Sequence, residues 1–195
     1  MKRVALVAMS AAMLGTMLTA AACNTLSPKL TPVLPVHVVP PDVKGATVLL
    51  ADEPIIETRD PVHIQRAKEH NVPHDLRVEM VRAFELAGFK VTEDPKAAFD
   101  LRAKVALAVS EPEGKVRQVY RCGLSRADGT AVAQVDWMWP EGTYVGDYEV
   151  LEFASHNLVT EVATSRPVVE ELRKRRSSTP PASAPPDAQP DASSP

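Results

Sequence analysis

Residues 99–109 read FDLRAKVALAV, and this stretch decides the fold class. Every odd position carries an apolar side chain, whereas Asp100, Arg102 and Lys104 occupy even positions. Successive side chains of a strand point to opposite faces of its sheet, so the alternation predicts a strand with one apolar face and one face in water. Such a strand is typical of a sheet that helices cover on one side only.

The residues that follow predict a hairpin. Residues 116–124 and 131–139 flank a segment that contains Asp128-Gly129. This dipeptide is a strong turn signal, because both central positions of the tight hairpin turn need positive φ. The two flanking strands should therefore pair antiparallel.

Two helices are predicted on either side of these strands. Residues 75–87 carry apolar side chains at helical spacing, and Gly88 supplies the expected stop. The apolar stripe of this helix consists of Leu76, Met80, Phe84 and Ala87. A second helix is predicted from about 149 to 164, and Pro167 marks a kink or restart before residues 168–176.

The remaining elements complete an α+β fold. Residues 46–51 form a short apolar run that predicts a central strand, and residues 90–93 predict another short strand. Residues 54–73 are polar and interrupted by prolines, so we expect a loop with at most one helical turn around residues 62–69. The predicted order is β-α-β-β-β-β-α, a mainly antiparallel sheet of about four to five strands with two helices packed on one face.

The N-terminus has the features of an export signal. Lys2 and Arg3 precede an apolar core, and small residues precede Cys23, so residues 1–22 are predicted to be a signal peptide. Residues 20–23, Ala-Ala-Ala-Cys, resemble the lipobox of bacterial lipoproteins, whose cysteine becomes the acylated first residue. Ala20 stands where leucine is usual, so ordinary secretory cleavage that leaves a free thiol is the alternative. Asn24 implies, by the same resemblance, sorting to the outer membrane.

Prolines predict the domain boundaries. Eleven of the 18 prolines fall within residues 28–41 and 180–195. Proline fixes φ and favours extended conformations, so residues 23–45 are predicted to be a lipidated cysteine followed by a proline-rich spacer. Residues 46–176 are predicted to form the folded periplasmic domain. The Pro/Ser/Ala-rich residues 177–195 have little to bury, and we expect a disordered tail.

Composition and motifs argue against several functions. The net charge of −3 becomes −5 once Lys2 and Arg3 leave with the signal peptide, which disfavours nucleic-acid binding. No phosphate-binding glycine motif occurs among the 8 glycines. His70 and His74 have a metal-ligand spacing, but Pro73 between them disfavours a continuous helix and no further ligand completes a set. We therefore expect no metal and no cofactor other than the lipid on Cys23.

No reactive group stands out as a nucleophile. The sequence contains the residue types of a catalytic triad: Ser155 or Ser125, His156 and Asp136. No nucleophile-elbow motif accompanies them, so nothing in the sequence indicates that they lie together. Cys122 shares a strand face with Tyr120, which favours a small buried apolar residue, and an intermolecular disulfide is the alternative. We expect no enzymatic activity and no catalytic residues.

Two sets of residues are candidates for binding. Six of the nine aromatic residues lie between residues 120 and 153. Trp137 is expected in the core, whereas Trp139, Tyr144 and Tyr148 form a predicted partner-docking patch at the sheet margin, with simple core packing as the alternative. The last helix ends in four basic residues: Arg173, Lys174, Arg175 and Arg176. Their positive charges either interact favourably with the helix dipole or bind an anionic ligand.

The order of elements behind an export signal and a proline-rich spacer resembles the small α+β lipoproteins of the Gram-negative envelope that assist assembly or transport machines. The resembling residues are 85–91, ELAGFKV, followed by 99–102, FDLR. This resemblance implies a non-enzymatic outer-membrane lipoprotein whose domain faces the periplasm and docks onto another envelope protein. The alternatives are a binding module for envelope glycan or lipid and, third, a hydrolase with an unrecognised site.

Overall fold

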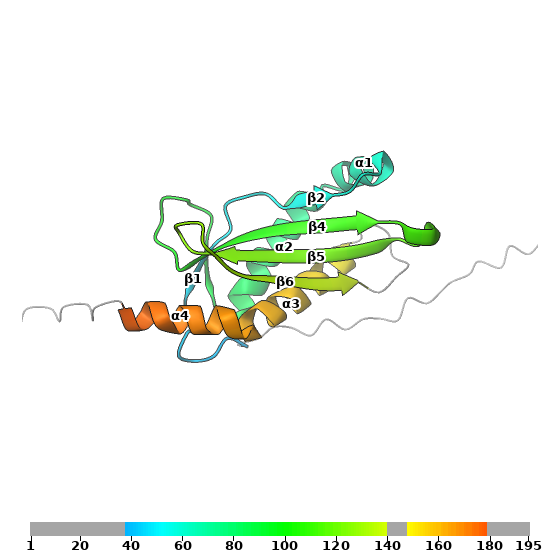
Figure 1. Cartoon of the computed structure of the whole chain (residues 1–195). Helices are drawn as coiled ribbons and strands as arrows, with labels where there is room; N and C mark the ends of the chain where they lie inside the picture. The colour runs from blue at the N-terminus through cyan, green and yellow to red at the C-terminus, as the bar shows by residue number, and fades with distance from the viewer. Residues whose placement is uncertain (1–37, 140–147, 179–195) are drawn as a thin grey trace, which may run out of the picture. The chain divides into compact units, whose positions relative to one another are not determined.

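The computed structural model describes residues 38–139 and 148–178, and within them six strands and four helices (Figure 1). The elements in chain order are β1 Thr47–Leu49, β2 Ile55–Glu57, α1 Pro61–Glu69, α2 Val72–Ala87, β3 Lys90–Thr92, β4 Leu101–Ser110, β5 Arg117–Ser125, β6 Ala131–Trp139, α3 Tyr148–Thr164 and α4 Arg166–Ser178, with a short 3-10 turn η1 at Pro112–Gly114. The predicted signal peptide, Cys23 and residues 179–195 of the tail lie outside the described residues.

The six strands form one mixed sheet in the order β3-β1-β4-β5-β6, with β2 pairing separately with β4. The hairpin strands β5 and β6 are antiparallel, and so are β4 and β5, which confirms the α+β class and the predicted hairpin. Strand β1 has the predicted interior position between β3 and β4. Pairs β1–β3, β1–β4 and β2–β4 are parallel, however, because the chain crosses through helices between them and returns in the same direction.

One face of the sheet is buried and the other is not. The odd positions of β4 from Leu101 to Val109 are buried, and the even positions are half-buried or exposed. The same alternation continues on β5, where Tyr120 and Cys122 are fully buried. Helices α2 and α3 lie behind the buried face (Figure 1). The predicted strand with one wet face is therefore confirmed.

The predicted helices are present with small shifts of their ends. Helix α2 begins at Val72, after Asn71 in a left-handed conformation, and ends at Ala87, where it is capped by Gly88 with a φ of 107° that suits glycine. Helix α3 has nearly the predicted bounds. Ser165 separates α3, which ends at Thr164, from α4, which begins at Arg166. The break occurs here because Pro167 fits the first turn of a new helix but not the interior of a continuing one.

The prediction of a loop over residues 54–73 is wrong in most of its length. It contains strand β2 and the nine-residue helix α1, which begins with Asp60 as its N-cap. The Asp60 carboxylate accepts a hydrogen bond from the Val62 backbone N–H at 2.8 Å. Helix α1 buries only His63 and Ala67, so its apolar periodicity is weak. The overlooked signal is Asp60-Pro61, an N-cap followed by proline in the first turn.

The core also includes residues before position 46. Val39 and Val43 are buried, and the Val39 N–H donates to the Ala87 carbonyl at 3.2 Å. The end of the proline-rich segment thus packs onto the end of α2. Within the described ranges, no helix combines the length and apolar character needed to cross a membrane.

Candidate functional site

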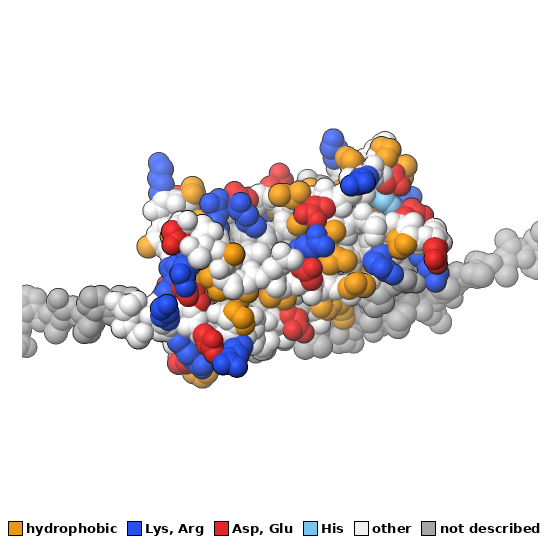
Figure 2. Space-filling view, in the orientation of Figure 1, with side chains coloured by type: hydrophobic (Ala, Val, Ile, Leu, Met, Phe, Trp, Pro, Cys, Tyr) orange, Lys and Arg blue, Asp and Glu red, His pale blue; other side chains and the backbone are white. Residues whose placement is uncertain are grey.

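The sheet face opposite α2 and α3 is not covered by these two helices and faces the viewer in Figure 2. Its centre is built from small side chains, with Ala106 and Ala108 on β4 and Gly123 on β5, all half-buried. Ile55 on β2 and Met138 on β6 lie toward its two sides and are 60% and 55% exposed. We call this surface, from Ile55 to Met138 across β2, β4, β5 and β6, the open face.

Ion pairs cross the open face. The Arg121 guanidinium on β5 donates to Glu57 of β2 at 2.8 Å and to Asp136 of β6 at 3.2 Å. Arg102 pairs with Asp52 at 3.0 Å. These side chains are substantially exposed, so each pair contributes little to stability. Their effect is to neutralise the positive charges of Arg102 and Arg121 within the open face.

Two hollows lie at opposite ends of the open face. The first, of about 460 Å³, is next to the β5–β6 turn and has three cations in its lining: Arg102, Lys104 and Arg126. Arg126 forms a bidentate pair with Glu171, at 2.7 and 2.6 Å, but no described carboxylate pairs with Lys104. The first hollow therefore has an available positive charge.

The second hollow, of about 680 Å³, lies between the start of α1 and the far ends of β4 and β5. The buried ring of His63 lies there, with Nε2 3.4 Å from the Glu111 carboxylate and 4.0 Å from that of Asp60. His63 was not among the residues predicted to be functional, because only one helical turn was expected where the nine-residue helix α1 places it.

The predicted aromatic docking patch is only partly described. Trp139 is 6% exposed, and its ring packs against Trp137 at 5.8 Å and Phe153 at 5.4 Å. This position corresponds to the core-packing alternative for Trp139. Tyr144 and the side chain of Tyr148 lie outside the described residues, so a patch built on these two tyrosines stays a prediction.

The cations at the end of α4 mostly contact the chain itself. Arg173 pairs with Asp42 at 2.5 Å, and this hydrogen bond is the main reason that the pKa of Asp42 is lowered. Arg176 donates to the carbonyl groups of Asp42 and Lys44, and Arg175 pairs with Glu171 at 3.2 Å. Lys174 is exposed. An anionic ligand at these four residues stays a prediction.

The structure does not bring together the serine, histidine and aspartate considered as a catalytic triad. Asp136 lies on the open face and pairs with Arg121, whereas Ser155 and His156 are fully buried on α3, behind the sheet. Cys122 is a fully buried free thiol, and burial raises its pKa to about 12. Its packing agrees with the expected small apolar role. His70 and His74 are both exposed, the former at the C-cap of α1 and the latter in α2.

Comparison with known proteins gives no family. No family model matches the chain, and no curated protein matches it. Similar solved structures include the PelC dodecamer from Paraburkholderia phytofirmans, which is 12% identical with a TM-score of 0.34 and covers 67% of this chain and 90% of its own. Protein XCC0632 from Xanthomonas campestris, of the family DUF330, is 16% identical with a TM-score of 0.35 and covers 73% and 95%. Both TM-scores are too low to establish a common fold.

Proposed function

We propose that this chain is an outer-membrane lipoprotein of a diderm bacterium that serves as a periplasm-facing accessory subunit of an envelope complex. The lipobox-like residues before Cys23 support the anchor. The observation that carries the accessory role is the open face, which offers a protein partner a broad and nearly neutral surface on the side of the sheet away from α2 and α3.

Three properties of the open face support docking. The small residues Ala106, Ala108 and Gly123 leave the backbone close to the surface, so a flat partner can approach closely. The exposed side chains of Ile55 and Met138 provide apolar area whose burial is favourable at about 25 cal/mol per Å². The internal ion pairs mean that a partner does not have to neutralise Arg121.

The first hollow supports a proposal for the chemistry of the partner. Lys104 is exposed there beside Arg102 and Arg126, both of which already have carboxylate partners. A partner that covers the open face would therefore place an acidic side chain near Lys104 and aliphatic side chains over the β4 alanines. Charge complementarity of this kind mainly sets orientation and association rate.

The anchor is tested first. Intact mass of the mature protein should show a lipid on Cys23, and Cys23→Ala should release the protein from the membrane fraction. An unmodified Cys23 terminus in the wild-type protein would overturn the anchoring part of the proposal.

Docking is tested by a photo-crosslinking amino acid placed at Val119 or Met138 on the open face and, as control, at the exposed Glu161 of α3. In intact cells, the two open-face positions should yield the same envelope protein, identified by mass spectrometry, and position 161 should not. Lys104→Glu should lower the yield about fivefold, the equivalent of about 1 kcal/mol, whereas Lys68→Glu on α1 should not.

The crosslinks also distinguish the alternatives. Equal yields from position 161 and the open face would contradict docking there. Adducts of glycan or lipid without protein would favour the binding module over the accessory role.

A further inference from the structure

A cluster of polar side chains is buried between helices α2 and α3. Glu79 of α2 is buried, His156 of α3 is fully buried, and Glu152 of α3 has 26% of its side chain exposed. Residues 152 and 156 are four apart, so both project from the same face of α3. One potential ligand atom from each of Glu79, Glu152 and His156 lies within 4.8 Å of the other two.

The imidazole of His156 is the unusual member of this cluster. Neither of its nitrogens has a hydrogen-bond partner among the described residues, although no part of the residue is exposed. A buried polar group without a partner is costly, and native structures contain few of them. Burial also lowers the pKa of His156, against the opposing effects of Glu152 and Glu79. A neutral imidazole presents one nitrogen lone pair to a ligand.

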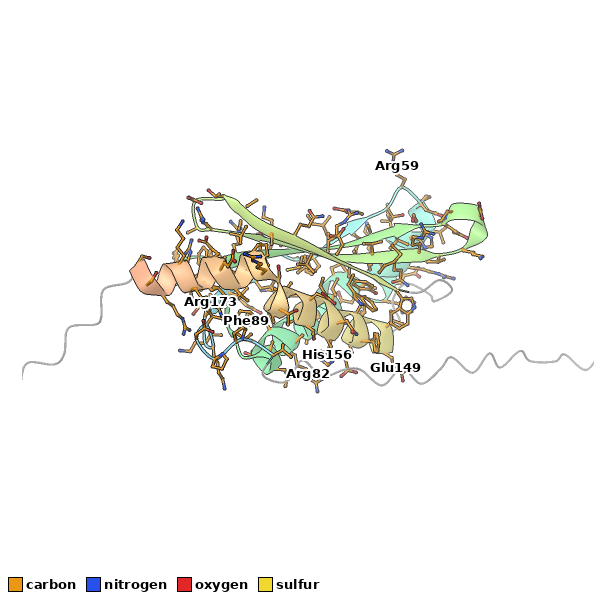
Figure 3. The ribbon with its side chains drawn as sticks, turned by 60° about the horizontal axis from the view of Figure 1, so that its bottom comes forward. Arg59, Arg82, Phe89, Glu149, His156 and Arg173 are labelled. Carbon is orange, nitrogen blue, oxygen red and sulfur yellow. The ribbon has the colours of Figure 1, made fainter. Side chains whose placement is uncertain are left out.

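A cation already lies at the mouth of the cluster. The Arg82 guanidinium is 3.6 Å from the Glu152 carboxylate and 3.9 Å from that of Glu79. These distances are longer than hydrogen bonds, and the Arg82 side chain is 56% exposed. Figure 3 labels Arg82 and His156 where α2 and α3 meet. Arg82 can therefore turn into solvent and leave the two carboxylates to a bound ion.

We propose that Glu79, Glu152 and His156 bind one divalent first-row transition metal ion, with Zn²⁺ as the best match. One imidazole and two carboxylates are a suitable ligand set, and three protein ligands leave a fourth position for water. Metal–ligand bonds of about 2.0–2.2 Å place tetrahedral ligand atoms about 3.4 Å apart, so modest rotation of the glutamate side chains closes the site. The bound ion would join α2 to α3.

A second group, Asp60, His63 and Glu111, also has ligand atoms within 4.8 Å of one another. It differs in that its carboxylates are 42% and 43% exposed, so both are well solvated without an ion. Its histidine makes a matched control for the buried cluster.

The test is calorimetric titration of ZnCl₂ into the full chain purified in detergent, with Co²⁺ absorption reporting the coordination. The wild-type protein should bind at the cluster, and Glu152→Gln and His156→Gln should each weaken that binding by more than about tenfold. Glu161→Gln on the same helix and His63→Gln should leave it unchanged. Arg82→Ala should strengthen Zn²⁺ binding, because the competing cation is gone.

The outcomes separate a metal site from a simple ion-pair network. Zn²⁺ should raise the melting temperature of the wild-type protein but not that of Glu152→Gln, which keeps the shape of the side chain and should fold even if His156→Gln does not. The proposal is overturned if the wild-type protein binds no Zn²⁺, if Glu152→Gln binds it equally well, if only His63→Gln loses it, or if Arg82→Ala weakens it.

Discussion

Leu172→Ala tests whether helix α4 belongs to the cooperative core. Leu172 is 2% exposed, and Val168 and Val169 on the same helix are also buried. These three residues face the main core cluster, whereas Lys174 points outward. If α4 folds and unfolds with the sheet, a cavity at Leu172 must lower the stability of the whole domain.

The expected loss follows from the packing. Leucine to alanine removes three buried carbon atoms, worth about 2.4 kcal/mol at about 0.8 kcal/mol each. The cavity left behind adds to this, and we expect a total of about 3 kcal/mol. For a domain of this size, that corresponds to a fall in melting temperature of about 10 °C.

Urea unfolding followed by tryptophan fluorescence provides the measurement, because Trp137 and Trp139 both pack against Phe153 of α3. Lys174→Ala on the same helix is the control and should change stability by less than about 0.5 kcal/mol. A loss below about 1 kcal/mol in Leu172→Ala, with amide exchange increased only within α4, would refute the assignment of α4 to the core.

Three further predictions concern single residues. The hydrogen bond from Arg126, together with one from Arg175, holds the pKa of Glu171 below its ordinary value of 4.5. The ionised Glu171 should therefore stabilise the folded protein above that pH, and this stabilisation should fade as the pH falls. The difference in urea midpoint between the wild-type protein and Glu171→Gln should therefore shrink from pH 7 to pH 3, and a constant difference would contradict the pairing. Cys122 should resist alkylation in the native protein at pH 8 and react readily in denaturant, as mass spectrometry can show, since burial raises its pKa to about 12; fast labelling of native protein would exclude the buried position. Gly88→Ala should cost about 1–2 kcal/mol in thermal unfolding because φ is 107° there, and an unchanged melting temperature would show that the helix end adjusts.

Parts of the candidate site were predictable and parts were not. The wet face of β4 followed from the alternation of residues 99–109, so the existence of an open sheet face could be predicted. The ion-pair partners of Arg121 on this face could not be predicted. Glu57 and Asp136 lie 64 and 15 residues from Arg121 in the chain, and only the register of the strands brings them together. Strand β2, which brings Glu57 there, is three residues long and carries too little pattern to be recognised.

The sequence by itself determined the α+β class, the hairpin, the end of α2 and the approximate bounds of α3, because these depend on local periodicity and on turn residues such as Gly88 and Asp128-Gly129. Only the tertiary structure decided that three of the five strand pairs are parallel, that Trp139 packs inward, and that Glu79 lies near His156. Those features arise from contacts between residues far apart in the chain, whose register and burial depend on how complete elements pack together. A local pattern carries no record of such contacts, since the same helix or strand can present its face to many different neighbours.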